Sequence, residues 1–281
     1  MTLIDTTVLI RLKRKMFDPY AFDSYQTAKV EHETGVTKAG RYNKRLFLDC
    51  FELSDTNSAF NDVYRYVNSN SVPWLDDGVR WVHVGPAFLD FRAGVEQLIK
   101  VARGKVDILA SKWDMLVAKD IVRLGPLANP GDYPSDIRTK YDIDFRVMPM
   151  PNVADFRVAI SDEDKQSLAR AVEDAKANAT KHLIAEMLEP LTKAAKKLAI
   201  PAGEDGSVFR DSLITNISDV LERAKKLNFL NDPTVNQLIS EIDQSVGRYS
   251  VAPDILRENT AARSQAHAQM SDILSKMAGL Y

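Results

Sequence analysis

The sequence is poor in the residues that build most chemical sites. It holds one cysteine, Cys50, and four histidines in 281 residues, so an internal disulfide is excluded and a zinc site of closely spaced Cys and His is not indicated. Cys50 lies in the apolar run of residues 46–51, which is typical of a structural thiol. The sequence also lacks a glycine-rich phosphate loop, a nucleophile elbow and a dinucleotide fingerprint. No catalytic constellation is recognisable.

Long apolar runs are missing as well. No stretch approaches the 18 apolar residues of a transmembrane helix, and the N-terminus lacks the pattern of a signal peptide. With 45% hydrophobic and 27% charged residues, the chain has room for one large domain or two small ones. The formal net charge of -2 argues against a protein that binds nucleic acid over its whole surface. We therefore expect a cytoplasmic protein without a membrane partner.

Two long helical patterns dominate the chain. Apolar residues recur every three to five positions through residues 86–124 and again through residues 162–199, a spacing close to one helical turn. Pro86 and Gly125 mark the ends of the first pattern, and Ser161 supplies an N-cap for the second. Neither helix buries its apolar stripe alone, so an antiparallel hairpin is favoured. An eleven-residue repeat in the second pattern indicates a nearly straight or slightly right-handed pair of helices instead of a strict heptad coiled coil.

Strand-like patterns are shorter and lie in the first 200 residues. Alternating apolar and polar residues predict strands over residues 6–17, 25–33, 79–84, 143–147 and 156–160. Residues 55–68 read as a helix capped by Ser54 or Asp55.

The last part of the chain carries only helical patterns, after a linker that contains proline and glycine. The expected fold class is α+β and mainly α. Residues 1–200 would form a long antiparallel helical hairpin with a small β-sheet at one end, and residues 207–281 a C-terminal helical region.

Basic residues gather in two N-terminal segments. In the first segment, Arg11, Lys13 and Lys15 alternate along a predicted strand and so share one of its faces. The commoner meaning of such a face is a solvated surface that guards a sheet edge, and the functional alternative is a strip that contacts phosphates.

Residues 37–45 form the second basic segment and the most basic short stretch of the chain. They read as a loop in which small, basic and aromatic residues mix, which is typical of a solvated loop or, alternatively, of a grip on a nucleic-acid backbone. Trp74 precedes a predicted turn that we expect at the same end of the fold. The candidate binding residues are Arg11, Lys13, Lys15, Lys38, Arg41, Tyr42, Lys44, Arg45 and Trp74, with no catalytic residue, metal ligand or cofactor.

A resemblance rests on the order of several turns and strands. The chain shows VPWLDDG at residues 72–78, a long helix containing Trp113, NPGDYP at residues 129–134, and the strand pair FRV at 145–147 and DFRV at 155–158. Over residues 1–200 it resembles a family of uncharacterised phage and mobile-element proteins often encoded near MoxR-type AAA+ ATPases. The resemblance implies a phage or mobile-element origin, a location in the host cytoplasm and an AAA+ ATPase as partner. It supplies no catalytic residues.

Three classes of function follow. The leading one is a non-enzymatic interaction or assembly protein, an adaptor or self-associating scaffold, because long apolar stripes call for a partner helix or a second copy of the chain. The alternative is a nucleic-acid-binding protein of phage DNA metabolism, which rests on the two basic segments. The third is an enzyme, for which no motif speaks.

Overall fold

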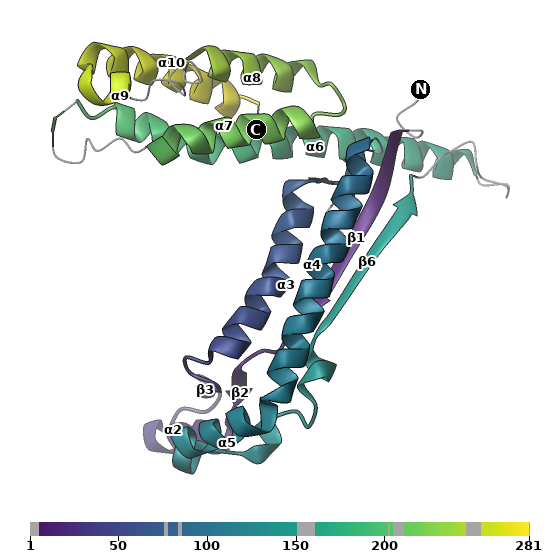
Figure 1. Cartoon of the computed structure of the whole chain (residues 1–281), viewed down its shortest axis with the longest axis vertical. Helices are drawn as coiled ribbons and strands as arrows, with labels where there is room; N and C mark the ends of the chain where they lie inside the picture. Colours follow the sequence, from purple (N-terminus) through teal and green to yellow (C-terminus); the bar gives the residue numbers. More distant parts are fainter. Residues whose placement is uncertain are drawn as a thin grey trace. The chain divides into compact units, whose positions relative to one another are not determined.

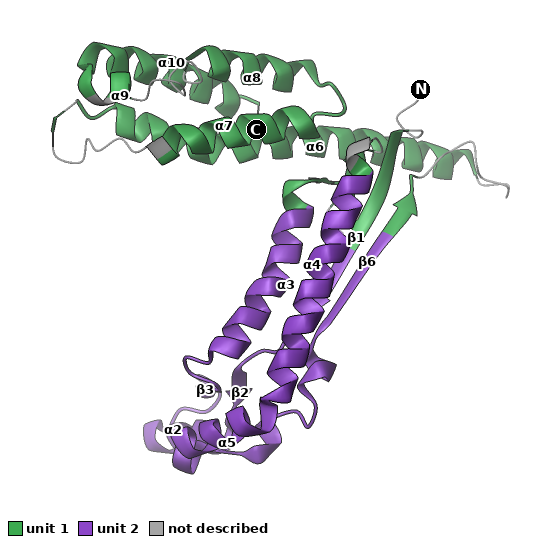
Figure 2. Ribbon diagram, viewed as in Figure 1, with its two compact units in different colours: residues 1–11, 68–88, 147–281 green, residues 12–67, 89–146 purple. Residues whose placement is uncertain are grey.

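The computed structural model describes residues 6–75, 78–83, 86–150, 161–201, 203–204, 211–245 and 254–280. It confirms an α+β class that is mainly helical (Figure 1). The chain forms two compact units, shown in Figure 2. Unit 1 consists of residues 1–11, 68–88 and 147–281, and unit 2 of residues 12–67 and 89–146. None of the described helices is long and apolar enough to cross a membrane.

The larger sheet has the strand order β4 (Val72–Pro73), β5 (Val79–His83), β1 (Thr7–Lys15) and β6 (Asp142–Pro149). β5 runs antiparallel to both β1 and β4. The strands predicted over residues 6–17, 79–84 and 143–147 are thus confirmed, and the one predicted over residues 156–160 lies outside the described residues. β1 lies between β5 and β6 in this order, so it is not an outer strand, although its pairing with β5 ends at Arg11, before Lys13 and Lys15.

Unit 1 is built on α6 (Asp162–Leu198), which confirms the second long helix. Ser161 caps it by accepting a hydrogen bond from the backbone of Asp164, as the sequence indicates. The apolar stripe of α6 is buried against α7 (Asp211–Leu227), α8 (Pro233–Ser245) and α10 (Thr260–Ala278), and the short α9 (Asp254–Glu258) precedes α10. Burial of this stripe therefore stabilises unit 1 from within.

Unit 2 holds most of α3 (Phe51–Ser69), most of α4 (Pro86–Ser111) and all of α5 (Trp113–Leu124). The prediction of one continuous helix over residues 86–124 is wrong, because the helix breaks at Lys112. The backbone of Lys112 donates to the Leu109 carbonyl in a tighter turn, and the buried Trp113 donates through Nε1 to the Pro134 carbonyl at 2.8 Å. The indole is held in the core against Phe17 and Phe47, and this anchor begins a new helix.

The N-terminal part of unit 2 also differs from expectation. Residues 25–33 are not a strand but part of α2 (Ser24–Thr34). Asp23 caps this helix by accepting from the backbone of Gln26, and Gly35, with φ of 69°, ends it in the left-handed conformation. These two caps favour a helix and outweigh the weak strand-like alternation of apolar and polar residues. α3 begins at Phe51, so neither Ser54 nor Asp55 is its cap.

The apolar stripes of the two long helical patterns are buried in separate cores. Ala102, Val106 and Leu109 of α4 pack with Phe60 of α3 in the core of unit 2. The stripe of α6 packs in the core of unit 1. A hairpin of α4 with α6 stays a prediction, as does an independent C-terminal domain over residues 207–281, since α7, α8 and α10 share their core with α6.

Candidate functional site

A highly exposed segment of unit 2 comprises residues 20–45 and is called the α2 segment below. It begins with β2 (Tyr20–Phe22), which pairs antiparallel with β3 (Asn43–Arg45) at its end, and α2 with a loop lies between these strands. All of residues 20–43 are described and none is buried, and Lys44 is the first buried residue of the segment. An ordered helix that buries no residue of its own is available for contact on most of its surface.

Large apolar side chains on the α2 segment face solvent. Tyr25 is 74% exposed, and the other exposed members are Tyr20, Phe22, Val30, Val36 and Tyr42. The guanidinium of Arg41 lies 4.4 Å from the ring centre of Phe22, a cation–π contact that links the loop to β2. Single exposed apolar residues need no explanation, but several within one short segment indicate an interaction site.

A pocket of about 430 Å³ lies between α2 and the following loop. Its walls include Val30 of α2 and Val36 and Tyr42 of the loop. Arg41, whose guanidinium lies over the Phe22 ring, also lines it. A hollow of this size with mostly apolar walls suits one apolar side chain of a partner.

Hydrogen bonds within the segment hold this pocket open. The backbone of Lys38 donates to Glu31 Oε1 at 2.6 Å, and the backbone of Tyr42 donates to Thr27 Oγ1 at 3.0 Å. Asp23 donates its backbone N–H to the Tyr42 carbonyl at 2.9 Å. The loop is therefore tied to α2 at both ends, and a partner meets a preformed surface.

Lys44 anchors the segment to the rest of unit 2. Its ammonium group contacts Asp132 Oδ2 at 2.7 Å, Asp23 Oδ2 at 3.3 Å and the Leu127 carbonyl at 2.8 Å. Burial on its own would lower the pKa of Lys44, but the hydrogen bonds with Asp132 and Asp23 raise it above its ordinary value. The ammonium is buried among two carboxylates and a carbonyl, so Lys44, predicted to bind a ligand, is placed as a structural cation.

A second anchor is the buried carboxylate of Asp120 on α5. It accepts from the backbone of Phe47 at 3.0 Å, from the Tyr133 hydroxyl at 2.8 Å and from Arg123 Nε at 2.7 Å. Desolvation would raise the pKa of Asp120, but the bonds from Arg123, Phe47 and Tyr133 lower it. Arg123 also donates to the Arg45 carbonyl at 2.8 Å. Asp120 thereby fixes the chain where it leaves β3 and where Phe47 adopts a φ of 51°.

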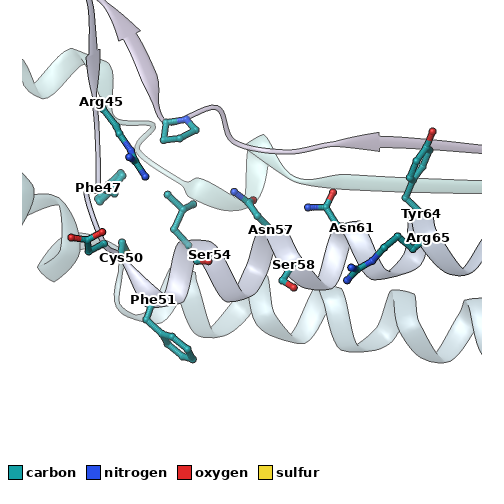
Figure 3. Close-up of a pocket in the computed structure, with 13 residues that line it drawn as sticks. Arg45, Phe47, Cys50, Phe51, Ser54, Asn57, Ser58, Asn61, Tyr64 and Arg65 are labelled. Atoms are coloured by element: carbon teal, nitrogen blue, oxygen red, sulfur yellow. The ribbon is translucent and has the colours of Figure 1, made fainter. Parts of the chain in front are cut away.

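A larger groove of about 870 Å³ runs along α3 (Figure 3). Arg45 points into it from the end of β3, and Asn57 and Asn61 point into it from α3, whereas the ring of Phe51 points away. Cys50 lies at one end of the groove, and burial raises the pKa of its thiol, which disfavours a reactive thiolate.

The remaining basic candidates lie on two elements. Lys38 and Arg41 are exposed on the α2 segment, while Arg11, Lys13 and Lys15 are exposed on β1. Lys15 Nζ donates to the Thr139 carbonyl at 2.9 Å. Arg14 lies on the opposite face of β1, with its guanidinium 4.3 Å from the ring centre of Tyr64. The stacking explains why a charged residue is tolerated on the apolar side of the strand.

Trp74 is not a surface residue. It is 5% exposed and packs edge-on against Trp81 in the core of unit 1, with ring centres 4.9 Å apart. Its backbone donates to the Val79 carbonyl at 3.0 Å, which closes the link between β4 and β5 and directs the indole inward. The expectation that Trp74 lies on a binding surface is therefore corrected.

The exposed aromatic residues of β2 and the start of α2 were missed at the sequence level. The signal was present as YAFDSY at residues 20–25, three aromatic residues around the Asp23 cap.

Among the residues that the structure describes, no group of three His, Cys, Asp or Glu residues is placed to hold a metal ion. No protein-family model matches the chain, and no curated protein or solved structure shows significant similarity to it.

Proposed function

We propose that this protein is a non-enzymatic interaction protein that docks a partner protein through the α2 segment. The observation that carries the proposal is an ordered, capped helix and loop, residues 20–43, that buries none of its residues and exposes six large apolar side chains. Ordering such a segment costs conformational entropy that no core of its own offsets, and several apolar side chains left in solvent on it indicate an interaction site.

The chemistry of the segment suits a protein better than a nucleic acid. Tyrosine and arginine are the residues that dominate protein–protein contacts, and Arg41 stacks on Phe22. Basic charge is partly neutralised, since Lys44 is buried between carboxylates and Lys29 lies 3.9 Å from Glu33. What remains is an apolar pocket with a basic rim, which fits an apolar anchor residue flanked by an acidic one.

The resemblance over residues 1–200 makes a MoxR-type AAA+ ATPase of phage or mobile-element origin the first partner to test. A second copy of the chain is the other partner, as an adaptor or self-associating scaffold requires. The sequence-based case for self-association assumed that the long stripes stay uncovered, yet each packs in the core of its own unit. The α2 segment is therefore the surface through which either partner would dock.

The test compares two exposed residues of similar exposure. Tyr25 on α2 is 74% exposed and Leu89 on α4 is 71% exposed. We expect Tyr25→Ala to weaken binding to a purified AAA+ ATPase, or to shift self-association measured by light scattering, by about tenfold or more, as an interface anchor does. Leu89→Ala is expected to leave both unchanged.

Two results would contradict the proposal. One is a wild-type protein that binds neither the ATPase nor itself. The other is binding that Leu89→Ala weakens while Tyr25→Ala and the pocket variant Val30→Asp do not, because the docking surface would then lie on α4.

A further inference from the structure

The groove along α3 is lined by a row of hydrogen-bonding side chains with an arginine opposite them. Ser54, Asn57, Ser58 and Asn61 follow one another on the face of α3 that lines it, at the spacing of one helical turn. Arg45 faces them from across the hollow (Figure 3). From residue 54 to residue 65 the helix runs roughly 16 Å, so the groove is long enough for an extended chain.

The two asparagines are oriented by partners inside the protein. Arg14 donates to Asn61 Oδ1, and since a guanidinium only donates, this contact identifies the oxygen of the amide. The Tyr141 hydroxyl donates to Asn57 Oδ1 at 2.8 Å. Within the described part of the chain, nothing accepts a hydrogen bond from the Nδ2 of either residue. Both amides therefore turn their N–H groups toward the groove.

The side chain of Arg45 is also left to donate into the groove. Its guanidinium makes no ion pair or hydrogen bond with any described residue, although its backbone carbonyl is held by Arg123. Carboxylates near the groove are already paired with a cation of the protein, Glu52 with Lys112, Asp55 with Lys105 and Asp62 with Arg65. Asp49 is the one carboxylate that lines the groove. Apart from Asp49 at one end, the charged groups that line the groove, Arg45 and Arg65, are positive.

We infer that this groove binds the phosphate backbone of single-stranded nucleic acid. A phosphodiester chain offers only acceptors, which is what Arg45 and the two amides require. A peptide backbone alternates donors with acceptors, whereas each asparagine oxygen of the row already accepts one hydrogen bond from within the protein and its N–H groups are left to donate. Tyr64, 43% exposed at the far end of the row, carries Arg14 over its ring and offers the exposed remainder of the ring to one base.

The site is separate from the pocket of the α2 segment, with which it shares no lining residue. Binding is tested on the whole chain with a fluorescent single-stranded oligonucleotide, whose anisotropy is measured at several salt concentrations. The informative variant is Asn61→Asp, which keeps the oxygen that Arg14 needs but replaces a donor in the groove with an anion. Gln97→Glu, an exposed position on α4 outside the groove, makes the same change of charge and serves as the matched control.

We expect Asn61→Asp to weaken oligonucleotide binding about tenfold, the effect of losing a charge-assisted contact, and Gln97→Glu to leave it near wild type. Arg45→Gln should reduce the slope of log K against log salt by about 0.7, the value for one phosphate on a single strand. Equal melting temperatures would show that the variants fold. The inference is overturned if the protein does not bind the oligonucleotide at low salt, or if Asn61→Asp and Gln97→Glu weaken it equally. Loss of partner docking in Tyr25→Ala would leave this result untouched.

Discussion

The two units use their apolar residues in different ways. Of the seventeen large hydrophobic side chains found exposed among the described residues, fourteen belong to unit 2 and three to unit 1. Unit 1 is a helical bundle whose apolar stripes close over one core. Unit 2 keeps apolar residues at its surface on α2, α3, α4 and α5. A closed core serves stability, whereas exposed apolar side chains on ordered elements indicate contact with other molecules.

The two units also differ in net charge. Unit 2 has 19 Lys and Arg against 17 Asp and Glu, a net charge of +2, and unit 1 has 18 against 22, a net charge of -4. The overall value of -2 hides this difference. Both surfaces proposed above, the α2 segment and the groove along α3, lie in the unit with positive charge. Net charge of the whole chain is thus a poor guide to what one face binds.

The largest expected effect tests the closed core of unit 1. Trp81 is fully buried between Trp74 and Phe229, so Trp81→Ala should lower the free energy of unfolding by about 4 kcal/mol. Tyr25→Ala, an aromatic deletion on the exposed α2 segment, should change it by less than about 0.5 kcal/mol. Urea unfolding followed by circular dichroism measures both. Similar losses for the two variants would show that unit 2 buries Tyr25 against something in solution.

A smaller effect tests the anchor of the α2 segment. Lys44→Met keeps the length of the side chain but leaves Asp23 and Asp132 without their cation, which should destabilise unit 2 by about 3 kcal/mol and weaken partner binding through Tyr25. Lys29→Met removes an exposed cation of the same helix region, 58% exposed at its side chain, and should cost about 0.5 kcal/mol at most. Chemical denaturation of both variants measures the two losses of stability. Equal, small losses would mean that Lys44 does not hold the segment.

The smallest effect concerns acid stability. The pKa of Asp120 is held below its ordinary value in the folded protein, so its carboxylate contributes stability above that ordinary value, and the contribution is lost as the pH falls through the lowered pKa. Asp120→Asn should cost about 2 kcal/mol at pH 7, and the difference from wild type should shrink below about pH 4. Asp114→Asn, an exposed change on the same helix α5, is the control. A difference that stays constant down to pH 2 would contradict a depressed pKa.

Helices with strong local signals were predictable from the sequence. α6 follows its Ser161 cap and its regular stripe, and β1 and β5 follow their alternation, because local periodicity and capping act between near neighbours in the chain. The α2 helix was mistaken for a strand although Asp23 and Gly35 stand at its ends. Its low apolar content left the pattern ambiguous, and only the capping chemistry distinguishes the two structures.

The candidate site was predictable in part. Residues 37–45 were singled out for their charge, and Arg41, Tyr42, Lys38 and Arg45 are indeed exposed. Composition cannot separate these residues from Lys44, because the acceptors that bury its ammonium lie at residues 23, 127 and 132. Trp74 was misjudged for the same reason, since its partner Trp81 and the other residues of its core are brought there by folding.

By itself, then, the sequence determined which stretches become long helices, where α6 begins and which segment carries the most positive charge, since these depend on neighbours within a few residues. Tertiary structure alone decided that the stripe of α4 ends at Lys112, where Trp113 meets Phe17 and Phe47. It also decided that one lysine of a basic loop is buried while its neighbours stay exposed, and that a row of asparagines on α3 turns its donors toward Arg45. The physical reason is that burial and hydrogen-bond partners come from residues distant in sequence, and no local pattern records them.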